Sequence, residues 1–249
     1  DRFKEAARRI AQQLQEYIRF VLPDFFENLA AYTEKNKYAW HTPGHMGGAG
    51  FLRAPSGTAF YKYYGENALR SDLSVSVSEL GSLLDHSGVT GEAEKNSARV
   101  FGADQTYYVL NGTSASNQII WSSQVTENDA ALLDRNCHKS LNYAMIRTKA
   151  LPIYMIPRRS RYGMIGPVSL SEFTEKSITD KIKKSPFFAE NIGTFPISMM
   201  ALTNSTYDGL CYNVKRILSV LSERIQRVHF DEAWFAYAAF HPIYRDFYG

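Results

Sequence analysis

Segments typical of buried strands alternate with segments typical of helices over most of this chain after residue 90. Strands are expected at 106–110, 130–133, 152–156, 197–202 and 228–230. Helices are expected between them at 91–101, 114–124, 139–148, 169–183 and 213–225. Strands separated by segments of helix length pair in parallel through crossover connections. We therefore expect an α/β fold with a mostly parallel sheet and crossover helices.

The first 37 residues have a different pattern. Apolar side chains recur every three or four positions from Phe3 to Val21, which predicts an amphipathic helix with a break near Pro23. The following stretch, 38–65, is rich in glycine and proline, and we expect a long structured loop there. We therefore divide the chain into a helical linker segment at 1–37 and one large domain at 38–249.

Composition and charge exclude several classes of protein. The formal net charge is +3 and no run of Lys and Arg is long, so we expect no nucleic-acid partner. No stretch of about 18 apolar residues occurs, so we expect no membrane span. The only two cysteines, Cys137 and Cys211, favour a reducing, cytoplasmic setting over a disulfide framework. Aromatic residues make up 14% of the chain, which predicts large buried interfaces or an aromatic-lined site.

A glycine followed by hydroxyl residues lies where the first expected strand runs into a helix. Gly112 permits a tight turn, and Thr113 and Ser114 can cap the helix. Because N–H groups at the start of a helix bind anions, this turn is a candidate phosphate site. It lacks the spacing of a Walker A loop or of a dinucleotide motif, and an ordinary helix cap is the alternative.

Polar residues also follow two of the later expected strands. Cys137 and His138 are adjacent, and as strand neighbours they would point to opposite faces, which argues against a Cys–His dyad. His138 either stacks on a planar ligand or is a half-buried structural histidine. Asp231 and Glu232 end the last expected strand, and only one of two neighbours in a strand can face a ligand. A carboxylate there can hold a protonated ring nitrogen or a metal ion.

Three histidines are candidate metal ligands. His41 and His45 lie in the glycine-rich segment, and His86 lies further along the chain. Their spacing matches no established metal motif, and the segment that carries the first two is not expected to be helical. We therefore expect no metal site.

An anion site, an aromatic plane and a strand-end carboxylate come in that order along the expected sheet. Pyridoxal phosphate needs this set of groups, because its phosphate, its ring and its pyridine nitrogen each require a partner. The carboxylate keeps the pyridine nitrogen protonated, so that the ring can accept electrons from a broken bond.

Seven motifs occur in an order and spacing that match one known family: HTPGH (41–45), SELGSLLDHSG (78–88), FGAD (101–104), NGTS (111–114), DRNCHKS (134–140), TNSTYDGLCYN (203–213) and HFDEAW (229–234). Through them the chain resembles the prokaryotic ornithine/lysine/arginine decarboxylases over essentially its whole length. These are pyridoxal-phosphate enzymes with the aspartate-aminotransferase fold (fold type I). The resemblance is closest to the lysine and arginine decarboxylases.

The resemblance implies that the chain forms part of the large domain of such an enzyme, with pyridoxal 5'-phosphate as cofactor. It implies cofactor contacts by Thr113 and Ser114 at the phosphate, His138 stacked on the ring, Asp231 on the pyridine nitrogen, Ala233 under the ring and Trp234 beside it. His138 and Asp231 would be the catalytic residues, and the segment 203–208 would lie near the phenolic edge of the ring. The family's lysine that binds the cofactor covalently follows HFDEAW by several dozen residues, so we expect it after Gly249 in a longer protein.

The implied reaction is decarboxylation of lysine or arginine to the corresponding amine and CO₂. Such a reaction consumes a proton, which would suit acid resistance or polyamine supply. The implied assembly is a homodimer built into a larger homo-oligomer, a decamer in this family. The alternatives are another fold type I enzyme, such as an aminotransferase, and a non-catalytic, oligomer-forming homologue.

Overall fold

The computed structural model describes residues 2–35, 38–40, 42–75, 77–188 and 196–249. The chain divides into two compact units, with the boundary between Tyr108 and Val109. The two units are described separately below as unit 1 and unit 2.

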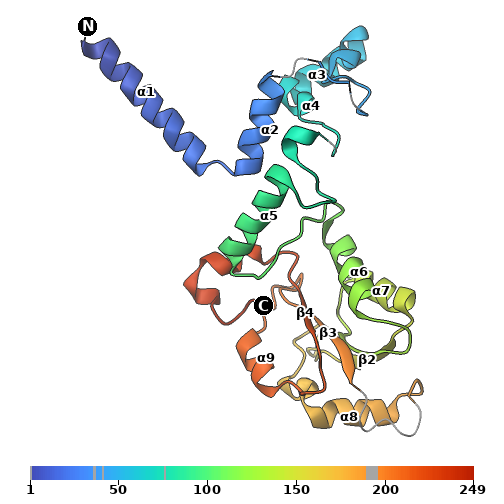
Figure 1. Ribbon diagram of the computed structural model, residues 1–249. Coiled ribbons are helices and arrows are strands. Elements are labelled where there is room, and N and C mark those ends of the chain that lie inside the picture. Colours follow the sequence, from blue (N-terminus) through green and yellow to red (C-terminus); the bar gives the residue numbers. More distant parts are fainter. Residues whose placement is uncertain (1, 36–37, 41, 76, 189–195) are drawn as a thin grey trace. The chain divides into compact units, whose positions relative to one another are not determined.

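Unit 1 is built from helices (Figure 1). These are α1 (Arg2–Val21), α2 (Asp24–Lys35), α3 (Pro55–Tyr64), α4 (Glu66–Arg70) and α5 (Gly88–Phe101), with short 3-10 helices at Ala49–Arg53 and Ser78–Leu80. The break predicted near Pro23 separates α1 from α2. The expectation of one long loop at 38–65 is wrong, because Pro55 begins α3. Proline suits the first position of a helix, where its fixed φ is favourable and its missing N–H is not needed.

The 78–88 motif forms a tight loop in unit 1. Ser82 and Ser87 exchange backbone hydrogen bonds of 3.2 and 3.1 Å. Nδ1 of His86 lies 2.7 Å from Oε2 of the buried Glu94. Oε1 of the same carboxylate accepts the backbone N–H of the last residue of the unit at 2.8 Å. This carboxylate therefore ties the loop to the end of unit 1.

Unit 2 is a three-layer α/β structure (Figure 1). Its sheet contains β1 (Ala130–Asp134), β2 (Leu151–Met155), β3 (Ile197–Thr203) and β4 (Val228–Asp231), in the order β2-β1-β3-β4. Every pairing is parallel. The helices are α6 (Gly112–Gln124), α7 (Lys139–Thr148), α8 (Glu175–Lys184) and α9 (Val214–Val220). The predicted α/β class, with a mostly parallel sheet and crossover helices, is confirmed.

Three further predicted elements differ from the structure. The helix expected at 169–183 is divided into a 3-10 helix at Leu170–Phe173 and α8, with Thr174 in an extended conformation between them. No strand forms at 106–110 among the described residues. There, Tyr108 donates its backbone N–H to the side chain of Glu94 in α5 at 2.8 Å, so this N–H is not available to a sheet partner. The Tyr108 hydroxyl also bonds to α5, at the carbonyl of Ala93 at 3.0 Å. The helix expected at 213–225 ends at Val220, because the backbone beyond it turns to pair with Ile197, the first residue of β3.

Alternate strand residues pack on opposite faces of the sheet, as the period of two requires. Ala130 and Leu132 of β1 belong to one core cluster, and Ala131 and Leu133 to the other. The first cluster includes Ile178, Ile182 and Ile217 from α8 and α9, and the second includes Trp121, Leu141 and Ala144 from α6 and α7. All five residues of β1 are buried, which is typical of a parallel strand covered by helices on both faces.

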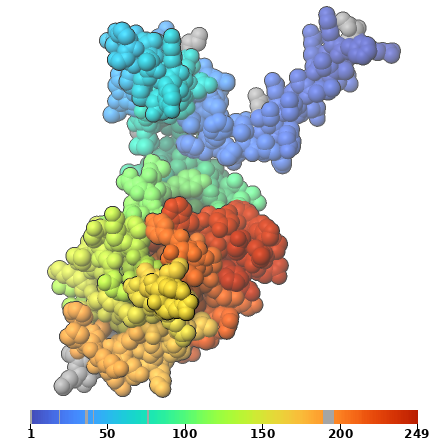
Figure 2. Space-filling view, turned by 180° about the vertical axis from the view of Figure 1, so that it is seen from behind, coloured from blue at the N-terminus to red at the C-terminus, as the bar shows by residue number. Residues whose placement is uncertain are grey.

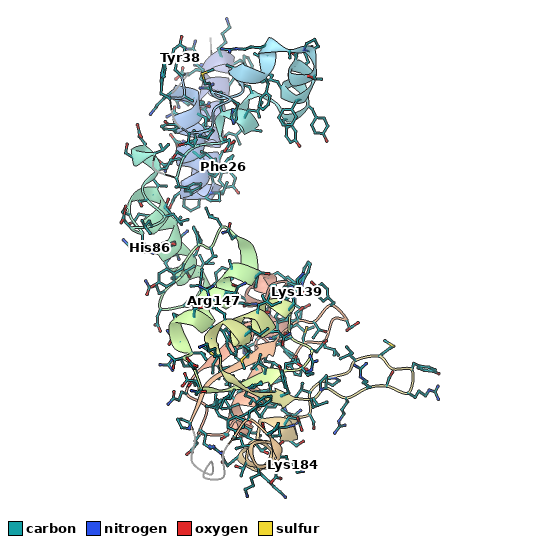
Figure 3. All side chains as sticks on the ribbon, turned by 90° about the vertical axis from the view of Figure 1, so that its right-hand side faces the viewer. Phe26, Tyr38, His86, Lys139, Arg147 and Lys184 are labelled. Carbon is teal, nitrogen blue, oxygen red and sulfur yellow. The ribbon has the colours of Figure 1, made fainter. Side chains whose placement is uncertain are left out.

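The first part of the connection between β2 and α8, residues 156–167, leaves this core. Arg159 and Ile165 form an isolated antiparallel bridge in it. Figure 2 shows this segment in yellow on the surface of unit 2, and Figure 3 shows it extending away from the sheet.

None of the helices in the described residues combines the length and apolarity needed to cross a membrane.

Candidate active site

A cavity of about 450 Å³ lies at the carboxyl ends of β1, β3 and β4. Its wall comes from the first turn of α6, the turn after β1, the loop after β3 and the end of β4. The chain order reverses between β1 and β3, because β2 lies beyond β1 and β4 lies beyond β3. Open α/β sheets bind ligands at such a point. Figure 3 marks this end of unit 2 by Lys139, which lines the cavity, and the opposite end by Lys184.

All six residues that the sequence predicts for the site line this one cavity: Thr113, Ser114, His138, Asp231, Ala233 and Trp234. They come from segments far apart in the sequence, and the sheet and its helices bring them together. Their individual contacts with a cofactor remain predictions.

The first turn of α6 brings N–H groups and hydroxyls to the cavity. The helix begins at Gly112, whose φ of +74° favours glycine. Its N-cap is Asn111, so the expectation that Thr113 and Ser114 cap the helix is wrong, and both lie within the first turn. Because N–H groups of a first turn have no acceptor within the helix, this wall of the cavity can bind an anion.

His138 is the N-cap of α7 and lies at the end of the turn after β1. Its Nδ1 accepts the backbone N–H of Ser140 at 3.2 Å and lies 2.8 Å from the Ser140 hydroxyl oxygen. One side chain thus starts the helix and contributes a ring to the wall of the cavity.

Cys137 lies in the same turn and lines the same cavity. Because β1 already ends at Asp134, the expectation that Cys137 and His138 alternate as strand neighbours is wrong. Burial raises the pKa of the Cys137 thiol to about 12, and the charge of Asp134 adds to the rise. The thiol is therefore protonated at neutral pH, which argues against a Cys–His dyad on different grounds.

Asp231 is buried at the carboxyl end of β4, with its two oxygens in different surroundings. Oδ2 accepts a hydrogen bond from Nδ2 of Asn117 at 3.0 Å. Oδ1 is buried and has no hydrogen-bond partner among the described residues. A buried acceptor without a partner costs about 1–3 kcal/mol, so Oδ1 favours a donor in the cavity.

The neighbouring Glu232 is bonded to other parts of the protein and does not line the cavity. Its Oε1 accepts Nδ2 of Asn204 at 2.6 Å and the backbone N–H of Gly249 at 3.0 Å. Burial raises the pKa of Glu232, and these two donors lower it in part. Of the two adjacent carboxylates, Asp231 lines the cavity, and Glu232 holds the chain after β4.

Two buried hydrogen bonds with a shared spacing join α6 to β4. Asn117 bonds to Asp231 at 3.0 Å, and Trp121 donates from Nε1 to Nδ1 of His229 at 3.1 Å. Four residues of a helix span about 6 Å and two residues of a strand span about 6.6 Å. The two spacings match, so both hydrogen bonds can form at once when α6 lies along β4. Thr113, one turn before Asn117, and Ala233, two residues after Asp231, both line the cavity.

Sequence reasoning did not single out Asn117 and Ser140, which are buried behind the cavity. The sequence did contain one sign of Asn117: it is a polar residue one helical turn from both Thr113 and Trp121, on the same face of the expected helix.

The predicted segment 203–208 also lines the cavity in part. Thr203 has a buried hydroxyl oxygen without a partner among the described residues. Tyr207 packs edge-on against Trp234, with 5.6 Å between the ring centroids.

Two of the three candidate metal ligands, His45 and His86, lie within the described residues. Within the part of the chain that the structure describes, no group of three or more His, Cys, Asp and Glu side chains could hold a metal ion. His41 lies outside the described residues. Nε2 of His45 lies 3.0 Å from Asp72, and its Nδ1 accepts the N–H of Gly48 at 3.0 Å.

Comparison with known proteins gives one family. A family model described as Orn/Lys/Arg decarboxylase, major domain, matches residues 23–249. Lysine decarboxylase LdcA from Pseudomonas aeruginosa is 51% identical over 244 residues, which are 98% of this chain and 32% of that protein. The biodegradative arginine decarboxylase of Escherichia coli is 45% identical over 242 residues, 97% of this chain and 32% of that protein.

Solved structures agree with this result. The structure of lysine decarboxylase A from Pseudomonas aeruginosa matches with a TM-score of 0.90 at 51% identity, covering 98% of this chain and 32% of that one. The Francisella novicida lysine decarboxylase LdcF matches with a TM-score of 0.89 at 40% identity, covering 97% and 33%. The chain therefore spans about a third of the length of the relatives it matches.

Proposed function

The chain belongs to the Orn/Lys/Arg decarboxylase family, and we propose that it supplies cofactor-binding residues of a pyridoxal 5'-phosphate-dependent decarboxylase of lysine or arginine. The observation that carries the proposal is Oδ1 of Asp231, a buried acceptor without a partner among the described residues, on a side chain that lines the cavity. When bound, the cofactor supplies an electron sink for the bond that is broken at the α-carbon of the amino acid.

The groups around the cavity fit this cofactor. A protonated ring nitrogen needs an acceptor, and Oδ1 of Asp231 is one. A phosphate needs donors, and the first turn of α6 offers N–H groups together with the hydroxyls of Thr113 and Ser114. His138 offers an aromatic plane for the ring, and the proposed set is completed by the small Ala233 and by Trp234.

Asp231 and His138 are the catalytic residues in this proposal. The negative charge of Asp231 favours the protonated form of the ring nitrogen, and the low dielectric of its buried position strengthens that interaction. His138 would hold the ring by stacking on it, and its imidazole could also donate a hydrogen bond to the carboxylate of the substrate.

The names of the relatives support a basic amino acid as the substrate, since they include lysine and arginine decarboxylases. We propose that the products are the corresponding amine and CO₂, with uptake of one proton. We propose a cytoplasmic role in acid resistance or polyamine supply, which proton uptake would suit and with which the two free cysteines are compatible.

An exposed apolar stripe on α1 supports assembly with further copies of the protein. Its exposed members are Phe3, Ile10, Leu14, Tyr17, Ile18 and Val21. Exposed apolar surface of this kind is typical of protein interfaces. We propose a homodimer built into a decamer, in which residues 1–37 are a helical linker and 38–249 belong to the cofactor domain. The mass of the intact full-length protein tests this, and a fully active monomer would contradict it.

Adding pyridoxal phosphate to the full-length apoprotein tests the cofactor assignment. We expect an absorption band that borohydride reduction removes, together with a permanent gain of the mass of the reduced cofactor. Ser114→Ala should weaken cofactor binding about tenfold, because a charge-assisted hydrogen bond is lost. Ser116→Ala is the matched control on the same helix, since its hydroxyl lies 3.5 Å from the carbonyl of Gly112 and Ser116 does not line the cavity. A full-length protein with no band and no mass gain would overturn the proposal.

A further inference from the structure

We propose that Asn117 and Ser140 are positioning residues that couple the carboxylate of Asp231 to the imidazole of His138. The inference rests on the proposed function, because it concerns the same cavity. It is carried by an unbroken chain of hydrogen bonds that runs behind the cavity from β4, through α6, to the start of α7.

Asn117 is the centre of this chain. Its Nδ2 donates to Oδ2 of Asp231 at 3.0 Å and to Oγ of Ser140 at 2.9 Å. An amide nitrogen has two hydrogens, and both are used here. A carboxylate only accepts, so the nitrogen end of the amide must face Asp231, and this fixes the orientation of the side chain.

Ser140 carries the chain to the imidazole. Its oxygen accepts from Asn117, so its own hydrogen can be donated to Nδ1 of His138, 2.8 Å away. The backbone N–H of Ser140 is donated to the same Nδ1 at 3.2 Å. Because a backbone N–H can only donate, Nδ1 is an acceptor, and the neutral imidazole carries its proton on Nε2. The backbone N–H of Ser140 thus selects this tautomer of the ring that lines the cavity, and the Ser140 hydroxyl can add a second donor to the same nitrogen.

The same amide selects an oxygen of the carboxylate. Oδ2 of Asp231 is occupied by Asn117, which leaves Oδ1 as the acceptor for a donor in the cavity. Asn117 and Ser140 are 1% and 2% exposed, so bulk water does not compete for these bonds. Asn117 therefore contacts one proposed catalytic residue directly and is linked to the other through Ser140.

The other end of the amide supports this role. Oδ1 of Asn117 is buried without a partner among the described residues, which is unfavourable by itself. An apolar side chain would avoid that cost but would leave Oδ2 of Asp231 and Oγ of Ser140 without their donor. The position is therefore better explained by the two bonds of the nitrogen than by packing.

Asn117→Ala and Ser140→Ala interrupt the chain at two different links in the full-length enzyme. We expect each to weaken pyridoxal phosphate binding to the apoprotein about tenfold, because each removes a hydrogen bond that orients a cofactor contact. In a double-mutant cycle on cofactor affinity, Asn117→Ala should have a smaller effect when Asp231 is already alanine, because both act through one interaction. Ser140→Thr keeps the hydroxyl and should recover affinity relative to Ser140→Ala.

Ser222→Ala is the control for loss of a buried hydroxyl elsewhere in unit 2, where Ser222 donates to Glu175 at the start of α8. It should lower the melting temperature and leave cofactor affinity unchanged. The inference is overturned if Asn117→Ala and Ser140→Ala behave like this control, or if the effects of Asn117→Ala and Asp231→Ala simply add. If Asn117→Ala does not fold, Ser140→Ala and its threonine rescue decide the question. A wild-type protein that binds no pyridoxal phosphate would instead overturn the proposed function.

Discussion

Trp121 of α6 donates its indole N–H to Nδ1 of His229 in β4 across 3.1 Å, and both side chains are buried. This bond fixes the helix against the strand, so that Asn117, one turn earlier, meets Asp231, two residues later. The position of the carboxylate in the cavity therefore depends on the register between a helix and a strand, which is more rigid than a loop.

Replacing Trp121 by Phe tests this register. The change leaves Nδ1 of His229 buried without its donor, so we expect the free energy of unfolding to fall by about 1–3 kcal/mol. Denaturant unfolding of the full-length protein measures the loss. Trp40 is 94% exposed, so Trp40→Phe serves as the control and should change little. Equal losses in the two variants would contradict the structural role given to Trp121.

The adjacent carboxylates should respond differently to neutralisation. Asp231→Asn should keep weak cofactor binding but lower turnover about 100-fold, because a neutral partner does not hold the proton on the ring nitrogen. Glu232→Gln keeps the oxygen that accepts from Asn204 and Gly249, and should retain most activity. Steady-state kinetics of the two variants, side by side, check this. Near-normal turnover in Asp231→Asn would show that its assigned role is wrong.

Substitutions at His138 separate the ring plane from its hydrogen bonds. His138→Phe should keep much of the cofactor affinity and lose rate, whereas His138→Ala should lose both, because only Phe keeps an aromatic plane. Cys137→Ser should matter little, since the thiol, with a pKa of about 12, is protonated at neutral pH. Cofactor titrations and turnover measure these effects. Loss of activity in Cys137→Ser, with intact cofactor binding in His138→Ala, would point to a thiol mechanism.

Asp134, at the end of β1, should make stability depend on pH. Burial raises its pKa from 3.8 to about 6, and a hydrogen bond from the backbone of Asn136 opposes the rise. The folded state thus holds the proton more tightly than the unfolded chain, so the associated stability is present below pH 3.8 and is lost as the pH rises through 6. In Asp134→Asn the side chain does not titrate, so the variant has no such pH-dependent loss of stability at this position. The free energy of unfolding of the variant relative to wild type should therefore rise by about 1–2 kcal/mol between about pH 5 and about pH 7.5. A difference that does not change with pH would contradict this.

Local sequence patterns predicted most elements of the sheet and its helices. β1 was predicted from a short apolar run, and all of its residues are buried. α7 was predicted from apolar residues at helical spacing, and the helix has a buried face. The strand expected at 106–110 could not be judged in this way, because the side chain of Glu94 in α5 competes for the N–H of Tyr108. Such a contact between distant residues is not visible in a local pattern.

The candidate site shows the same limit. Thr113, His138 and Asp231 were predicted because strand ends and helix starts mark the ligand-binding edge of a sheet. Asn117 and Ser140 were not predicted, because their importance comes from two hydrogen bonds that join two helices and a strand. The cap of α6 was assigned wrongly to hydroxyl residues, since Asn111 also precedes the helix and sequence alone does not rank such neighbours.

Release of CO₂ from carboxyl-labelled lysine and arginine by the full-length protein tests the account most directly. We predict that CO₂ and an equal amount of the amine form from one or both amino acids only when pyridoxal phosphate is bound, and that Asp231→Asn lowers this rate about 100-fold. Formation of a keto acid without CO₂, or no reaction of either amino acid with the cofactor bound, would contradict the proposed decarboxylase.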